Sequence, residues 1–403
     1  MVTVSAALFE QFPVIDVDTH VTEPPDTWTA RVASKWGDAI PHIVHVDGMD
    51  RWVAGDQRLG IPGQTAMAGF DGVLPDGPAT YDEMHRGAWD PVARLEFQDD
   101  QGIVAQVLYP NIGGFGASYW LTWTDRELAL ACVRAYNDFL TDFCSPDPNR
   151  LLAVTSIPFW DVDASVAEIE RCLANGHRGI NFCNQPDAHG EPPVFSTHWD
   201  PIWSLVQEAG IPVNFHIGGG DISALRDRRG LDFKSHFARA SSLLFTDNMR
   251  CIGDLVFGGV CHRYPDIDFV SVESGAGFVP SMLESFDWQW RNGGVTDEHP
   301  EYELLPSEYF RRQIYACFWF ERAGVRFALD LYPDNMLFET DFPHPTCQHP
   351  GPRTPAMEPR QYADEVLGDL PESTVRKVLF ENAARLYSVN LPIQQAAHRE
   401  VSP

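Results

Sequence analysis

Two carboxylates and an imidazole alternate at the end of the first apolar segment of the chain. The stretch PVIDVDTHVTEP (13–24) places Asp16, Asp18 and His20 at every second position. Alternate side chains of a strand point to the same face, so the spacing predicts a row of polar groups at the tip of a buried strand. Taken alone, Asp16 is better interpreted as a turn or capping residue.

Further residues that could bind metal or move protons end later apolar segments. His216 lies in NFHIG (214–218), Glu273 follows FVSV (269–272), and Asp341 and His344 lie in FETDFPHP (338–345). Imidazole and carboxylate groups that meet at one point suit a divalent metal ion. We therefore expect a metal site, with Glu273 and Asp341 also acting as catalytic acid–base groups. The expected ligands are Asp18, His20, His216, Glu273, Asp341 and His344.

Four polar residues near these positions have weaker interpretations. His344 could instead donate a hydrogen bond to a ligand. Asn181 and Asn214 are interpreted as structural residues or substrate contacts, and Glu23 either orients a ligand imidazole or caps the loop at EPP.

The share of carboxylates bears on which metal is expected. Zinc sites are rich in nitrogen and sulfur, whereas a site with three acids and two or three histidines favours iron or manganese. Three carboxylates also carry more charge than one divalent ion neutralises, which favours two ions with a bridging carboxylate.

Eight short apolar or β-branched segments alternate with helical patterns, and these segments must position the polar residues. The expected strands lie in 14–17, 103–110, 151–158, 178–183, 211–218, 267–274, 313–320 and 335–343. Eight such units predict an α/β fold, a (β/α)₈ TIM barrel whose active site lies at the carboxyl ends of the strands. A doubly wound open sheet is the alternative.

The spacing of the segments predicts one large domain. We expect a single barrel domain over 1–390, with closing helices in 355–390 and a tail at 391–403. The connection after the first strand is unusually long, and 25–89 is rich in Gly, Pro, Asp and Trp. Long connections are usually functional, so this segment is predicted to be a lid over the barrel mouth.

Composition and charge restrict the binding partners of the protein and the cellular compartment in which it is expected. The 403-residue chain has a formal charge of −28, which disfavours nucleic acid and anionic membrane surfaces as partners. No run of 18 apolar residues and no signal peptide is evident, and the eight cysteines form no C-x-x-C pair. These features predict a cytoplasmic protein that acts on a small molecule.

Four motifs resemble the amidohydrolase superfamily, in the branch that contains aminocarboxymuconate-semialdehyde decarboxylase and the resorcylate-type decarboxylases. They are VIDVDTHVTEP, NFHIG, FVSVESGAG and FETDFPHP, and the resemblance runs from residue 13 to about 388. It implies that Asp18, His20, His216 and Asp341 are metal ligands. This chain departs from the pattern of the branch at two positions. Asp18 replaces the first histidine of a His-x-His pair, and Glu273 replaces a histidine that serves as the base.

Both departures move the site towards oxygen donors, and the chain is also similar to a subgroup of non-haem diiron monooxygenases with this fold. That similarity implies two iron ions, dioxygen as co-substrate, hydroxylation of a bulky apolar substrate and a ferredoxin-type electron donor. No G-x-G-x-x-G follows a strand, so no flavin site is predicted in the chain itself.

The alternative is a mononuclear zinc or manganese enzyme that hydrolyses, or decarboxylates without oxidation, a small carboxylic acid. A binding protein without catalytic activity is a third option. Because many barrels of this kind pair, a homodimer is one option for the assembly.

Overall fold

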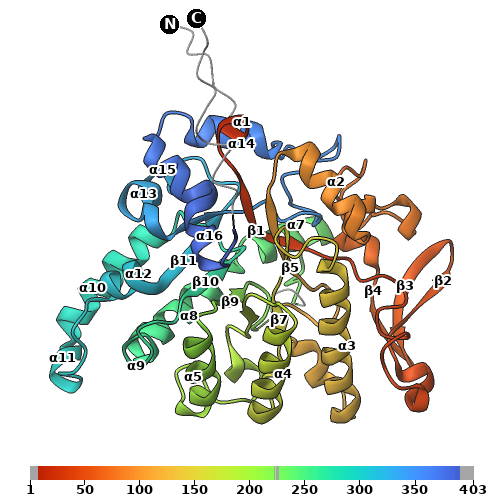
Figure 1. The fold of residues 1–403 in the computed structure, drawn as a ribbon, viewed down its shortest axis with the longest axis horizontal. Coiled ribbons are helices and arrows are strands. Elements are labelled where there is room, and N and C mark those ends of the chain that lie inside the picture. Colours follow the sequence, from red (N-terminus) through yellow and green to blue (C-terminus); the bar gives the residue numbers. More distant parts are fainter. Residues whose placement is uncertain (1–7, 222, 224–226, 391–403) are drawn as a thin grey trace, which may run out of the picture.

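The computed structural model describes residues 8–390, except 222 and 224–226. The predicted tail at 391–403 lies outside this range. Strands run at the centre of the molecule and helices surround them, as Figure 1 shows. Every predicted strand segment contains a strand: β1 (Ile15–His20), β5 (Ala105–Tyr109), β6 (Leu151–Ala153) with β7 (Thr155–Ser156), β8 (Ile180–Asn181), β9 (Val213–His216), β10 (Phe269–Val272), β11 (Ile314–Phe318) and β12 (Met336–Phe338).

The order of the strands confirms the predicted barrel rather than the doubly wound sheet. Neighbours are parallel and follow chain order, as β1-β5-β6 and as β7 through β12. The two sheets share the segment that carries β6 and β7. On the other side, the ring is joined by a single parallel bridge between Thr19 and Phe342 rather than by a regular ladder. The backbone N–H of His20 donates to the Phe342 carbonyl at 2.7 Å across this join.

The surrounding helices begin and end where local signals predict. Asp90 caps α2 (Pro91–Gln101) by accepting from the N–H groups of Val92 and Ala93, and Gly102 ends the helix in a left-handed conformation. Other helices around the strands include α3 (Arg126–Cys144), α4 (Val162–Ala174), α5 (Asp200–Ala209), α8 (Phe245–Phe257), α10 (Val279–Gly293), α12 (Pro306–Gln313) and α13 (Gly324–Leu331). The closing region 355–390 contains α14 (Pro359–Leu367), α15 (Glu372–Arg376) and α16 (Asn382–Leu386).

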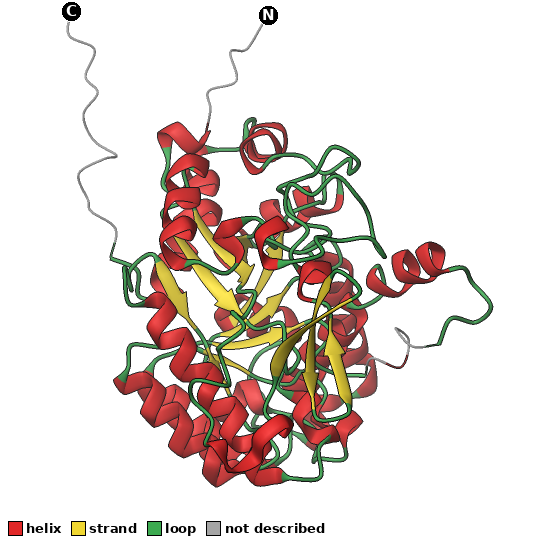
Figure 2. Ribbon diagram, turned by 90° about the vertical axis from the view of Figure 1, so that its right-hand side faces the viewer, coloured by secondary structure: helices red, strands yellow, loops and turns green. Residues whose placement is uncertain are grey.

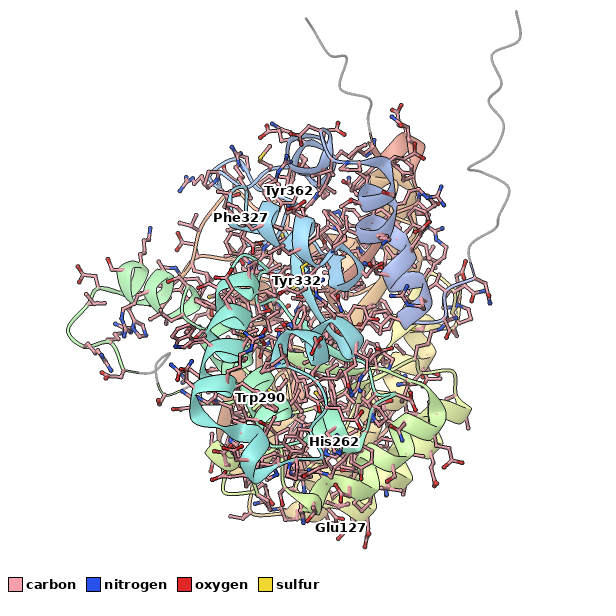
Figure 3. All side chains as sticks on the ribbon, turned by 90° about the vertical axis from the view of Figure 1, so that its left-hand side faces the viewer. Glu127, His262, Trp290, Phe327, Tyr332 and Tyr362 are labelled. Atoms are coloured by element: carbon pink, nitrogen blue, oxygen red, sulfur yellow. The ribbon has the colours of Figure 1, made fainter. Side chains whose placement is uncertain are left out.

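Aromatic side chains fill the space between the outer helices and the barrel. Trp290, Tyr332 and Tyr362 are buried, whereas Phe327 of α13 is 69% exposed on the outer face (Figure 3). No helix among the described residues is long and apolar enough to cross a bilayer.

The long connection after β1 forms a separate small sheet. Its strands β2 (His42–Val46), β3 (Met49–Ala54) and β4 (Gln57–Gly60) are antiparallel and face the viewer in Figure 2. Trp28 and Trp52 from this segment pack edge to face at 5.0 Å. The Trp28 indole N–H donates to the Cys132 carbonyl on α3 at 3.0 Å, which fixes the segment to the barrel wall.

A second insertion lies between β9 and α8 and contains α7 (Phe233–Ser241). Described residues of this insertion and of the connection after β1 line one cavity together with Glu273, Asp341 and His344.

Candidate active site

A β-bulge in β1 determines which of its polar residues face the site. The pairing of β1 with β5 shifts between Asp16 and Thr19, so one extra residue lies on β1. The shift puts Asp16 and Thr19 in one hydrogen-bonded network with Gln106 and Arg94. Asp16 also accepts from the backbone N–H and the hydroxyl of Thr340, at 2.9 and 2.6 Å. Asp16 is therefore a structural residue outside the cluster that Asp18 and His20 enter.

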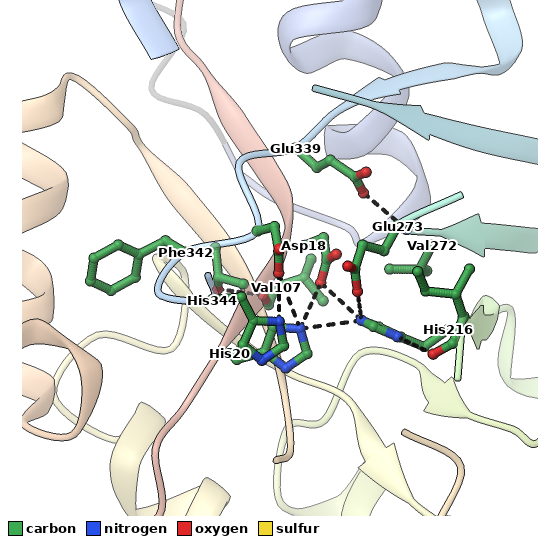
Figure 4. A network of polar contacts seen from close by, with 12 residues as sticks. Asp18, His20, Val107, His216, Val272, Glu273, Glu339, Phe342 and His344 are labelled. Atoms are coloured by element: carbon green, nitrogen blue, oxygen red, sulfur yellow. Dashed lines mark hydrogen bonds and ion pairs between the residues drawn. The ribbon is translucent and has the colours of Figure 1, made fainter. Parts of the chain in front are cut away.

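Side chains from four strands meet around two imidazole nitrogens (Figure 4). The Nε2 atoms of His20 and His216 are 3.2 Å apart. Asp18 Oδ1 lies 3.5 Å from each of them, and Glu273 Oε2 lies 3.3 Å from His216 Nε2. Asp341 Oδ1 lies 3.6 Å from His20 Nε2. The six residues predicted from the sequence are thus brought together, and they form two overlapping groups whose ligand atoms lie within 4.8 Å of one another.

The hydrogen bonds of the two rings, in their neutral forms, leave Nε2 of His20 and of His216 without a hydrogen. His20 Nδ1 lies 3.1 Å from the Pro110 carbonyl, and His216 Nδ1 lies 2.8 Å from the Ile217 carbonyl. A carbonyl only accepts, so each Nδ1 carries the hydrogen, and a neutral ring then presents a lone pair at Nε2. Neither oxygen of the buried Asp18 has a hydrogen-bond partner in the described part of the chain. Lone pairs that face one point without donors fit a divalent cation.

The two strand-end carboxylates are held in strained backbone conformations. Glu273 has a φ of 55° and Asp341 has a φ of 59°. These values lie in the left-handed region, which residues other than glycine rarely adopt. Such strain persists where the surrounding structure enforces it, often at functional sites. Burial, followed by the charges of Asp341 and Asp18, raises the pKa of Glu273 well above its ordinary value. Burial and the charge of Asp18 likewise raise the pKa of Asp341.

The two imidazoles differ in their electrostatic surroundings. Burial, together with His344 and His216, lowers the pKa of His20 well below its ordinary value. Burial also opposes the charging of His216, but Asp18 and Glu273 outweigh it and raise the pKa of that ring. A bound cation would replace these influences with its own charge.

His344 is held between a loop and the cluster. Its ring stacks on His20 with centroids 3.6 Å apart, and its Nε2 lies 2.8 Å from Asn111 Oδ1. Its Nδ1 lies 2.8 Å from Asp341 Oδ1. Asn111 follows β5, where Glu23 accepts from the backbone N–H groups of Asn111 and Ile112 at 2.9 and 3.0 Å. Glu23 therefore fixes this loop and contacts no ligand imidazole directly.

The predicted asparagines do not join the cluster. Asn214 accepts from the Tyr387 hydroxyl at 2.6 Å and donates to the Ile180 carbonyl at 3.0 Å, so it links β8 and β9 to the closing region. Asn181 pairs with Asn214 in the parallel register and is buried.

Sequence reasoning missed two residues that border the site. Glu339 is fully buried, and its Oε2 accepts from the Glu273 backbone N–H at 3.3 Å. Its position two residues before Asp341 on the same strand end was the available signal. Phe115 packs on His216 and His20 with ring centroids 4.3 and 5.0 Å away. It lies in an irregular loop, where no periodicity identifies it.

An apolar cavity of about 600 Å³ opens beside the cluster. Glu273, Asp341 and His344 line one side of it. Large apolar side chains form much of the remaining wall: Leu74, Phe115, Ile217, Phe237, Leu244, Phe245, Trp319 and Phe320. A concave apolar pocket with a few convergent polar groups is the usual form of a small-molecule site.

The barrel and the cation-binding cluster at its strand ends define a metal-dependent enzyme of the (β/α)₈ class. The chain belongs to the amidohydrolase family, whose model matches residues 15–389. This match confirms the resemblance that the four motifs predict.

Comparison with known proteins gives the following similarities. The chain is 23% identical over 273 residues to a gamma-resorcylate decarboxylase of Rhizobium radiobacter, which covers 64% of this chain and 77% of that protein. An amidohydrolase structure from Mycobacterium avium subsp. paratuberculosis has a TM-score of 0.71 at 23% identity, covering 93% and 99% of the two chains. A 5-carboxyvanillate decarboxylase from Novosphingobium aromaticivorans, complexed with manganese, has a TM-score of 0.63 at 18% identity, covering 94% and 97%.

These similarities show that the prediction of a diiron monooxygenase is wrong. The curated relatives are decarboxylases rather than oxygenases, so two irons, dioxygen and a ferredoxin-type donor have no support. The prediction failed because oxygen ligands at Asp18 and Glu273 suit manganese as well as iron. Ligand types alone therefore carry no information about redox chemistry.

Proposed function

We propose that the chain is a metal-dependent decarboxylase that removes the carboxyl group of a hydroxylated aromatic acid without oxidation. The observation that carries the proposal is the position of Glu273, which belongs both to the cation-binding cluster and to the wall of the apolar cavity. A proton donor at that boundary faces the space where a ring would lie. The gamma-resorcylate decarboxylases among the relatives support the same reaction.

Asp18, His20, His216 and Asp341 are the proposed metal ligands, because oxygens of both carboxylates lie 3.5 and 3.6 Å from His20 Nε2 and Asp18 also lies 3.5 Å from His216 Nε2. Manganese is the first ion to test because a related decarboxylase binds it. A divalent cation there would bind the substrate carboxylate and the ring hydroxyl and would offset the negative charge of the site. Asn111 Oδ1 accepts from His344 Nε2, so the Nδ1 lone pair of a neutral His344 faces Asp341 Oδ1 at 2.8 Å, and both atoms point towards the cluster. Phe115 limits the space over both ligand imidazoles.

Decarboxylation of an aromatic acid needs a proton at the ring carbon that carries the carboxyl group. We assign this proton to the Glu273 carboxyl. A carbon–hydrogen bond forms at that carbon as the bond to the carboxyl carbon breaks, and carbon dioxide leaves. The apolar wall excludes water from the ring, and Glu273 is then reprotonated from solvent through the cavity mouth. No oxidant takes part, so atoms and electrons balance.

The test is turnover of a panel of hydroxylated aromatic acids, including gamma-resorcylate and 5-carboxyvanillate, by manganese-loaded protein. We expect each acid that is turned over to give carbon dioxide and the corresponding ring product with hydrogen in place of the carboxyl group, at equal rates with and without oxygen, and we expect a chelator to stop the reaction. Glu273→Gln should lower kcat by about 100-fold or more while one metal ion per chain remains bound. Loss of turnover on removal of oxygen, or an unchanged kcat in this variant, would overturn the proposal.

A further inference from the structure

The cavity beside the cluster is larger than a single aromatic acid. Its volume of about 600 Å³ equals that of roughly 20 water molecules at liquid density. A dihydroxybenzoate has about half as many non-hydrogen atoms. Cavities of about 300–1,000 Å³ are usual for drug-sized ligands, which are largely buried in them.

The character of the wall changes with distance from the cluster. Glu273, Asp341 and His344 are the ionisable side chains among the described lining residues, which include no lysine or arginine. Among these described lining residues, a substrate anion therefore has no positively charged side chain to pair with, and the metal centre is the cation partner that the proposed function supplies. Away from it, the wall is made of apolar rings and aliphatic chains with short hydroxyl and amide side chains between them.

Residues from two insertions line the part of the cavity wall that does not belong to the barrel. Gln64, Thr65 and Leu74 enter from the connection after β1, and Phe237 and Ser241 enter from α7. Trp319 and Phe320, which pack edge to face at 4.6 Å, continue the wall at the end of β11. Phe320 is 61% exposed, and an apolar ligand in the cavity would cover part of its ring.

We propose that the substrate is an aromatic monocarboxylic acid that carries a second large apolar group, of the size of a further ring or a long alkyl chain. The inference deepens the proposed function and rests on it for the placement of the carboxylate at the metal centre. The apolar group extends towards α7, between Phe237 and Trp319. A second carboxylate on the substrate would be buried without a cation partner, so dicarboxylic acids bind poorly.

The test is calorimetric binding of three probes to the manganese-loaded protein, namely salicylate, 5-phenylsalicylate and 4-hydroxyisophthalate. They share a carboxylate and an ortho hydroxyl and differ in one ring substituent. Burial of the second ring should tighten binding of 5-phenylsalicylate by at least about 30-fold over salicylate, whereas 4-hydroxyisophthalate should bind no more tightly than salicylate. Equal affinities for salicylate and 5-phenylsalicylate, or a preference for the dicarboxylate, would overturn the inference.

A matched pair of variants on α7 locates the apolar group. Ser241 lines the cavity, whereas Ser235, on the same helix, is exposed and does not. Ser241→Trp should reduce the preference for 5-phenylsalicylate over salicylate to below about threefold, and Ser235→Trp should leave it unchanged. Metal content and melting temperature show whether each variant is folded. If Ser241→Trp misfolds, Ser241→Leu gives the same comparison with a smaller expected change. If a folded, metal-loaded Ser241→Trp or Ser241→Leu variant kept the full preference for 5-phenylsalicylate over salicylate, the placement of the apolar group beside α7 would be contradicted.

The two proposals can fail separately. If none of the acids, 5-phenylsalicylate included, is decarboxylated but the binding preference holds, the reaction is wrong and the shape of the ligand stands. If a small acid is decarboxylated but the binding preference is missing, the reaction stands and the inference about the substrate is wrong.

Discussion

Asp16 and Asp18 are chemically identical, fully buried and two residues apart, yet their surroundings are opposite. Asp16 accepts from Thr340 and Gln106. Asp18 has no hydrogen-bond donor for either oxygen in the described part of the chain and faces two imidazole nitrogens. A buried carboxylate without donors is costly unless a cation compensates it. The first residue thus stabilises the fold, and the second destabilises it until metal binds.

This difference predicts opposite effects of the same substitution. Asp18→Asn should abolish tight binding of manganese and should raise the free energy of unfolding of the metal-free protein by about 1 kcal/mol or more, because a buried acid without donors is replaced by a neutral amide that can itself donate. The measurements are metal content by mass spectrometry and unfolding in denaturant with a chelator present.

Asp16→Asn is the matched control. It should keep one metal ion per chain and should lower the free energy of unfolding by about 2 kcal/mol, because the donors of Thr340 and Gln106 lose one of the two carboxyl oxygens that accept from them. If Asp16→Asn also abolished metal binding, or if Asp18→Asn left the metal in place, the assignment of the two residues would be contradicted.

The sequence predicted most of the site residues that end regular strands, but it missed Glu339 at the end of β12 and the residues of an irregular loop. Asp18, His216 and Asp341 are polar residues after apolar runs, and strand ends in a barrel meet at one rim. Phe115 and Asn111 come from an irregular loop after β5, whose path depends on the Glu23 carboxylate. The role of Asp16 depends on a β-bulge, which shifts the alternation of β1 and has no clear signal in the residue types.

At the scale of elements, strands and helices were predictable because their signals are local. An Asp cap, an early proline and a final glycine delimit α2, and alternating or continuous apolar residues mark the strands. The sheet β2–β4 and α7 were not predicted as elements. Both lie in insertions, and β2 to β4 have mostly half-exposed side chains, so their hydrophobic pattern is weak.

His177 connects three elements and makes the barrel wall sensitive to acid. Its Nε2 lies 3.0 Å from the Thr141 hydroxyl on α3, and its Nδ1 lies 3.0 Å from the Thr155 hydroxyl on β7. Burial lowers the pKa of His177 from 6.5 to about 4. The folded protein therefore keeps this ring neutral, whereas the unfolded chain takes up a proton below pH 6.5. Its stabilising contribution is complete above pH 6.5 and decreases as the pH falls towards 4.

The loss expected from this group over that pH range is about 3 kcal/mol of unfolding free energy. His177→Gln should flatten the pH dependence by that amount, because glutamine does not titrate. The comparison is chemical denaturation from pH 7 to 4 in the presence of a chelator, which keeps metal release out of the result. The exposed His198 offers a control, and His198→Gln should keep the slope of the wild type. Identical slopes for His177→Gln and the wild type would contradict the assignment.

At the scale of the whole molecule, negative charge is in excess both on the surface and at the centre. The formal charge is −28, and four carboxylates from three strand ends lie buried or nearly buried around the cluster: Asp18, Glu273, Glu339 and Asp341. Salt screens exposed charges that lie farther apart than the Debye length of about 10 Å at 0.1 M, but it screens buried groups much less. The repulsion between surface charges should therefore be reduced by a monovalent salt, whereas the repulsion between the buried carboxylates should be reduced by a divalent cation bound among them.

We expect two separable effects on thermal stability. Raising sodium chloride from 0.05 to 0.5 M should raise the melting temperature of both the metal-free wild type and Asp18→Asn, because surface repulsion is screened. Manganese at about 100 times its dissociation constant should stabilise the wild type by a further 2.7 kcal/mol or so through mass action, and it should not stabilise Asp18→Asn. Calorimetry with both cations on both proteins measures this. If sodium chloride alone stabilised the wild type as much as manganese does, the stabilising cation would act at the surface and not between Asp18, His20 and His216.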